Sequence, residues 1–149
     1  MIERGLNVSY LWHDFAALEV RISASNGEFA GVAEPYTDLQ AITDAAAKLE
    51  GFPVNAQDVR DLEFGAPGEE FAGGYGRLRF FCVDLAGHAA VEIWIATKEG
   101  YRASSGREIP AQSVHMIARI EAAAIDDFVR ELRELNENFR GSADLRFAN

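Results

Sequence analysis

Hydrophobic and polar residues alternate along four segments of the chain. These segments are residues 17–23, 76–83, 88–97 and 112–120. Alternation with a period of two is typical of a β-strand that buries one face, so each segment is predicted to be a strand. Asn26-Gly27 follows the first strand and predicts a two-residue type I′ turn, because both residues tolerate the positive φ angles of that turn. The return strand of this hairpin is expected at residues 28–34.

Two other segments have the three- or four-residue spacing of amphipathic helices. The first carries one apolar stripe, made of Leu39, Ile42, Ala46 and Leu49. Thr37 and Gln40 fit a capping box at its start, while Gly51 and Pro53 are suited to end it. The second helix is expected from about residue 122 to residue 139. Its apolar stripe consists of Ile125, Phe128, Val129, Leu132, Leu135 and Phe139.

The predicted elements follow one another in the order ββαβββα. Because short turns join antiparallel strands, we predict an α+β fold with a single antiparallel sheet of about five strands and two helices on one face. A chain of 149 residues suits one domain, so residues 1–149 are assigned to a single domain. Residues 53–74 are long for a loop, and we expect a short helical turn near residues 57–62 or a functional role.

Composition and charge narrow the class of protein. Hydrophobic residues make up 48% of the chain, which is too apolar for a disordered protein. Asp and Glu number 24 against 14 Lys and Arg, a formal net charge of −10. This acid excess argues against nucleic acid or an anionic membrane as a partner. No apolar run reaches the roughly 18 residues of a membrane span, and a single cysteine fits a cytoplasmic protein.

The residue types that most often carry catalysis do not form a constellation in this sequence. His13, His88 and His115 are far apart and Cys82 is the only cysteine, so we predict no metal site and no cofactor. Cys82 lies within a predicted strand, where a free cysteine usually serves as a small buried hydrophobic residue. The glycines between residues 65 and 76 lack the Gly-Lys-Ser/Thr ending of a phosphate-binding loop. We assign no catalytic residues and favour a protein without enzyme activity.

The clearest candidate site is the face of the sheet that points away from the helices. If the apolar residues of the three central strands face the helices, the residues between them face outward. The outward set includes Arg79, Phe81, Glu92, Trp94, His115, Ile117 and Arg119. Large apolar groups mixed with charges of both signs are typical of protein interfaces, and Trp and Arg often anchor them. This set is therefore a candidate surface for a protein partner or for a second copy in a homodimer.

Two other uses of this face stay open at the level of sequence. Residues 2–15 at the N-terminus, or Leu145 and Phe147 near the C-terminus, would fold across it as an internal cover. Alternatively, the face would hold a ligand pocket lined by Arg79, Trp94, His115 and Arg119. A small ligand-binding domain or enzyme would use this outer face or the glycine-rich loop, and it would need a cavity with convergent polar groups.

Turn residues around the central strands resemble those of a known family. Residues 73–79 read Gly-Gly-Tyr-Gly-Arg-Leu-Arg, and the pairs Val83-Asp84 and Gly87-His88 precede the apolar strand at residues 89–96. This pattern is similar to small uncharacterised bacterial α+β proteins of a domain-of-unknown-function family, some of which are likened to immunity proteins of polymorphic toxin systems. The resemblance spans roughly residues 15–140 and carries over no catalytic residue.

A non-enzymatic protein-binding module is therefore the leading hypothesis, with a toxin protein as the partner that the resemblance implies. Acidic inhibitors of basic nucleases gain association rate from electrostatic steering. A net charge of −10 suits an immunity-like inhibitor of this kind.

Overall fold

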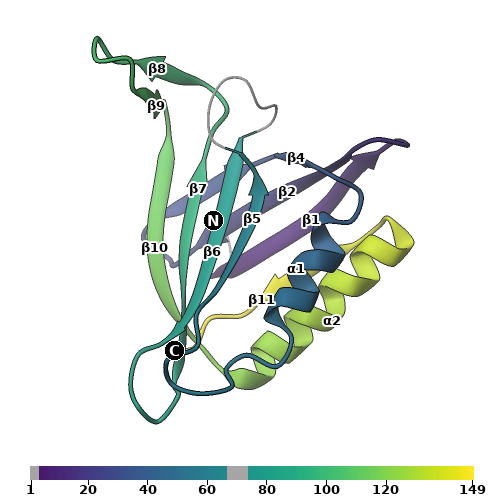
Figure 1. Cartoon of the computed structure of the whole chain (residues 1–149), viewed down its shortest axis with the longest axis vertical. Coiled ribbons are helices and arrows are strands. Elements are labelled where there is room, and N and C mark those ends of the chain that lie inside the picture. Colours follow the sequence, from purple (N-terminus) through teal and green to yellow (C-terminus); the bar gives the residue numbers. More distant parts are fainter. Residues whose placement is uncertain (1–3, 67–73) are drawn as a thin grey trace.

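In the computed structural model, which describes residues 4–66 and 74–149, the chain forms two packed β-sheets, a projecting hairpin and two helices (Figure 1). The helices are α1 (Ala41–Leu49) and α2 (Ala122–Asn138). The strands before α1 are β1 (Gly5–His13), β2 (Leu18–Ser25), β3 (Ala30–Ala33) and β4 (Tyr36–Thr37). Those after it are β5 (Arg60–Gly65), β6 (Tyr75–Cys82), β7 (Ala89–Ala96), β8 (Gly100–Arg102), β9 (Glu108–Pro110), β10 (Ser113–Ile120) and β11 (Ser142–Leu145).

The strands are distributed over two main sheets and one hairpin. The five-stranded sheet has the order β11-β1-β2-β3, with β4 beside β2, and the four-stranded sheet has the order β10-β7-β6-β5. Every strand pair that the structure describes is antiparallel. Strands β8 and β9 form a hairpin that projects beyond the ends of β7 and β10 (Figure 1).

The core lies between the two sheets and the helices. On one side, β3 packs against β7 and β10, and Gly31 of β3 lies so close to Val114 of β10 that no Cβ atom would fit between them. Further along, Gly76 of β6 faces Ile22 of β2, where an added Cβ would come within 2.7 Å of the Ile22 Cδ1 atom. On the other side, α1 packs against β5 while α2 packs against β11 and β1 (Figure 1).

The predicted single sheet of about five strands in the order ββαβββα is wrong, although the α+β class is correct. The segments predicted at 17–23, 76–83, 88–97 and 112–120 do form β2, β6, β7 and β10. The chain adds a strand at each end, and β1 pairs with both β2 and β11. The alternation of β1 is interrupted by a register shift between Tyr10 and Trp12, which hides the strand from a period-two pattern.

Residues 53–74 contain a strand instead of the predicted helical turn near residues 57–62. Strand β5 pairs with β6 along its whole length. Its alternation is short but regular, because Leu62 and Phe64 are buried while Asp61 and Glu63 point away from the core. The surrounding glycines and prolines made this segment look like a loop. Residues 67–73 of the predicted loop lie outside the described residues.

The hairpin between β2 and β3 also differs from the prediction. Asn26 and Gly27 belong to a four-residue connection, because β2 ends at Ser25 and β3 begins at Ala30. The Asn26 side-chain oxygen accepts hydrogen bonds from the backbone N–H groups of Glu28 and Phe29. Asn26 therefore organises a longer turn through its side chain, and the return strand is shorter than residues 28–34.

A residue from α2 performs the capping role that was predicted for Thr37. Thr37 belongs to β4, and Gln40 precedes α1 without a side-chain cap. Asn136 of α2, which is only 5% exposed, accepts a 2.9 Å hydrogen bond from the backbone N–H of Thr43 and donates one of 2.9 Å to the carbonyl of Leu39. An N–H in the first turn of a helix needs such an external partner, so Asn136 fastens α1 to α2.

Candidate functional site: the outer face of the four-stranded sheet

Strands β6, β7 and β10 of the four-stranded sheet alternate between a side that faces the core and an open side. The buried residues on the core side include Leu78, Phe80, Val91, Ile93, Ile95, Met116, Ala118 and Ile120. All seven residues of the candidate surface lie on the opposite side, which we call the outer face. Its half-buried members are Arg79, Phe81 and Glu92. Its exposed members are Trp94, His115, Ile117 and Arg119.

The segments proposed as an internal cover for this face lie elsewhere. Strands β1 and β11 belong to the five-stranded sheet, and Leu6 and Leu145 are buried in the core. Phe147 also packs against the core. Trp94 and Ile117 remain 43% and 55% exposed. The alternative in which residues 2–15 or Leu145 and Phe147 cover the outer face is therefore not met by the described residues of these segments.

Strand register arranges the outer face in rows of alternating charge. One row contains Asp61, Arg79, Glu92 and Ile117, and the next contains Glu63, Arg77, Trp94 and His115. Arg77 and Arg79 each lie 3.1 Å from the carboxylate of Asp61. Burial by itself raises the pKa of Asp61, but the hydrogen bonds and charges of Arg79 and Arg77 outweigh it and hold the pKa below its ordinary value. These ion pairs fix the two guanidinium groups beside Trp94.

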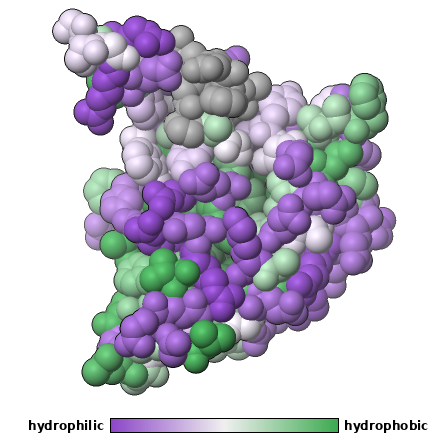
Figure 2. Space-filling view, in the orientation of Figure 1, coloured by the Kyte–Doolittle hydropathy of each residue, from purple (hydrophilic) through white to green (hydrophobic). Residues whose placement is uncertain are grey.

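Trp94 stands at the edge of an open depression in this face. The depression has a volume of about 480 Å³ and is lined by Arg77, Arg79, Glu92, Trp94, Ser113 and His115. Across it, His115 Nε2 lies 2.7 Å from a carboxylate oxygen of Glu92. Beyond the charged rows, the β6–β7 turn carries the exposed side chains of Val83 and Leu85. Figure 2 shows hydrophilic side chains across the front of the molecule and hydrophobic ones gathered at the lower left, towards this turn.

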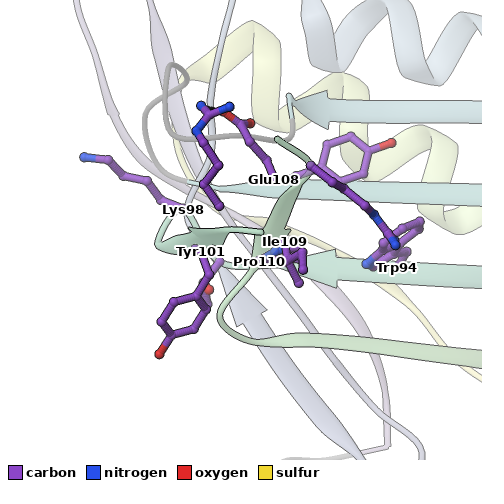
Figure 3. A pocket seen from close by; sticks show the side chains of 12 residues that line it. Trp94, Lys98, Tyr101, Glu108, Ile109 and Pro110 are labelled. Carbon is purple, nitrogen blue, oxygen red and sulfur yellow. Dashed lines mark hydrogen bonds and ion pairs between the residues drawn. The ribbon is translucent and has the colours of Figure 1, made fainter. Parts of the chain in front are cut away.

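A second, more enclosed hollow lies on the other side of Trp94, under the β8–β9 hairpin. This cavity has a volume of about 360 Å³ (Figure 3). The rings of Tyr75 and Trp94 form its inner wall and meet edge to face, with centroids 6.4 Å apart and planes at 80°. Ile109 and Pro110 belong to its outer wall on the hairpin. Tyr75 is only 7% exposed although it belongs to the outer face, so this end of the sheet is partly covered.

Sequence reasoning missed this cavity, because residues 101–110 looked like a variable connection. The sequence signal for a hairpin was Gly106, which stands between the short segments 100–102 and 108–110. In the structure Gly106 has a positive φ of 89°, which suits a tight turn. Tyr101 and Ile109 are register partners on either side of that turn. The hairpin itself was therefore accessible from sequence, whereas its position beside Trp94 was not.

The residues considered for catalysis remain separate in the structure. His13 stacks on Phe139, with ring centroids 4.1 Å apart, and His88 pairs with Asp84 inside the β6–β7 turn at 2.6 Å. Burial raises the pKa of Cys82, and the nearby Asp58 and Asp84 raise it further, which disfavours a reactive thiolate. Across residues 4–66 and 74–149, no three His, Cys, Asp or Glu side chains are grouped as ligands of one metal ion.

The glycine-rich loop lies largely outside the described residues. At its end, Gly74 directly precedes β6 and Gly76 lies within that strand, so the loop leads into a strand and not into a helix. A helix N-terminus is the element that binds phosphate in glycine-rich loops of the nucleotide-binding type. Within the described part of the chain, neither helix is long and apolar enough to cross a membrane.

Comparison of the chain with protein-family models, with curated proteins and with solved structures finds no match.

Proposed function

We propose that this chain is a non-enzymatic protein-binding module whose contact surface is the outer face of the four-stranded sheet. The observation that carries the proposal is the exposure of Trp94 and Ile117 on the neighbouring strands β7 and β10, beside paired charges. Trp and Arg are the residues that most often dominate binding energy in protein interfaces. Large apolar side chains next to polar and charged groups occur together in such interfaces.

The charge distribution favours a basic protein as the partner. Residues 76–119, which supply β6, β7 and β10, hold four acids and six bases, whereas the whole chain has a net charge of −10. The negative charge that attracts a basic partner over a distance thus lies mainly outside these strands. The acidic surface outside these strands would steer a basic partner towards the chain, and the near-neutral outer face would then make the close contact. This division of roles fits an immunity-like inhibitor of a basic toxin protein.

Co-expression with the proteins encoded by neighbouring genes tests the proposal. The tagged chain is captured at low and at physiological salt, and we expect one of these proteins to be retained. The substitution Ile117→Arg should abolish the capture, because it replaces an exposed apolar contact with a charged side chain that would have to lose its water on binding. Val32→Arg is the matched control, since Val32 is a similarly exposed β-branched residue on β3 of the other sheet.

Two results would count against this function. If the Ile117→Arg and Val32→Arg variants capture the partner equally well, the outer face is not the contact surface. If no protein is retained at either salt concentration, the chain does not bind a protein partner encoded by a neighbouring gene. Light scattering on the chain alone separates a homodimer from a heterologous complex, because only a homodimer would dissociate in the Ile117→Arg variant without any other protein present.

A further inference from the structure

The cavity under the β8–β9 hairpin has the size and the wall chemistry of a small-ligand site. Its volume of about 360 Å³ lies near the lower end of the range of about 300–1,000 Å³ that is usual for such sites. It is formed by two separate elements, the outer face at Tyr75 and Trp94 and the hairpin at Ile109 and Pro110. Figure 3 shows Ile109 beside Trp94, while the side chain of Tyr101 extends away from them.

The inner wall of the cavity suits a flat apolar group. Tyr75 and Trp94 present rings at 80° to each other, so a planar ligand packs against one face and one edge at the same time. The Tyr75 hydroxyl is already engaged, since it donates a 3.2 Å hydrogen bond to Glu63. Ile109 adds an aliphatic side chain that is 40% exposed. Tyr75, Trp94 and Ile109 therefore offer the apolar part of a ligand a site that relies on packing and not on hydrogen bonds.

The rim of the cavity carries positive charge in an otherwise acidic protein. Its charged residues are Lys98, Arg102, Arg107 and Glu108. Arg102 is neutralised by Glu108, at 2.8 Å, and also donates to the carbonyl of Gly106. Lys98 extends away from Trp94 in Figure 3. Within residues 4–66 and 74–149, no carboxylate forms an ion pair with Arg107, which makes its guanidinium the available anchor for an anion.

We propose that this cavity binds a small aromatic carboxylate, with the ring between Trp94 and Ile109 and the carboxylate on Arg107. A guanidinium binds a carboxylate through two parallel hydrogen bonds, which orients the ligand as well as attracting it. The ligand is a small molecule, so this site adds a second binding function to the proposed protein interface. The two sites share Trp94, but Ile117 belongs to the protein interface alone, because it does not line the cavity.

Titration with phenylacetate, followed by NMR of the isotope-labelled chain, tests the site. The indole N–H signals of Trp94 and Trp12 are assigned with a Trp12→Phe variant. We expect phenylacetate to shift the Trp94 signal in a saturable way and to leave the Trp12 signal unchanged. Phenylacetamide, which lacks the charge, should bind at least about tenfold more weakly, because charge-assisted hydrogen bonds are the stronger ones.

The variant Arg107→Gln should weaken phenylacetate binding to the level of the amide, whereas Arg140→Gln, in an exposed position after α2, should have no effect. An unchanged Trp12 signal shows that the variants are folded. The proposal is overturned if the Trp94 signal of the folded chain shows no saturable shift, if the amide binds as well as the acid, or if Arg107→Gln binds like the wild type. Phenylacetate binding that persists in Ile117→Arg separates this site from the protein interface.

Discussion

Two neighbouring phenylalanines on β6 provide a direct test of which side of the four-stranded sheet is buried. Phe80 is 0% exposed, and its ring meets that of Phe52 edge to face, with centroids 6.0 Å apart. A buried phenylalanine removes roughly 150 Å² or more from water, which at about 25 cal/mol per Å² gives about 4 kcal/mol. The substitution Phe80→Ala should therefore cost about 3–5 kcal/mol. Phe81 is half-buried on the outer face, and Phe81→Ala should cost about 1 kcal/mol or less.

Urea unfolding followed by far-UV circular dichroism measures this difference. With a slope of about 2 kcal/mol per M, Phe80→Ala should lower the unfolding midpoint by about 2 M and Phe81→Ala by no more than about 0.5 M. The two residues are adjacent in sequence and chemically identical, so their unfolded states are closely matched. Equal midpoint shifts for the two variants would refute the assignment of inner and outer faces.

Two further outcomes follow from the polar groups of the fold. Asn136→Ala should destabilise the chain by about 1–3 kcal/mol in urea unfolding, because it leaves the Thr43 N–H and the Leu39 carbonyl without their partner. The control is Asn138→Ala, on the exposed side of α2. Its free energy of unfolding should stay within about 0.5 kcal/mol of the wild type. Burial, together with the adjacent Glu63, raises the pKa of Tyr75 to about 12. The unfolded value is about 10, so the stability this group contributes is complete below about pH 10 and is lost as the pH rises towards about 12. Tyr75→Phe should consequently lose less stability than the wild type between about pH 9 and about pH 11, and equal losses would contradict the buried position of the hydroxyl.

The part of the fold that could be predicted from sequence is the part with uninterrupted alternation and short connections. β6 and β7 are joined by a short turn, and their inward residues follow one another at every second position. β1 and β5 lacked such clear signals, because β1 contains a register shift at Tyr10 and β5 has only two buried apolar residues. The pairing of β1 with β11 joins the two ends of the chain, and a local pattern contains no information on such a contact.

The candidate site shows the same division between local and long-range information. The direction of Trp94 and Ile117 followed from alternation, because a residue's face in a strand depends on its position relative to its neighbours. The burial of Tyr75 could not be predicted from alternation, because its position in the strand puts it on the open side. It lines the cavity that a separate hairpin forms at this end of the sheet. Likewise, the trans-capping of α1 by Asn136 depends on how two helices meet, which neither helix shows alone.

The two tryptophans allow the proposed interface to be measured with an internal control. Trp94 is 43% exposed on the outer face of the four-stranded sheet, and Trp12 is 46% exposed on the five-stranded sheet. Hydroxyl-radical footprinting of the free chain should oxidise both to a similar extent. In the complex with the captured partner, we expect protection of Trp94 while Trp12 reacts as before. Protection of Trp12 with unchanged oxidation of Trp94 would contradict a binding role for the outer face.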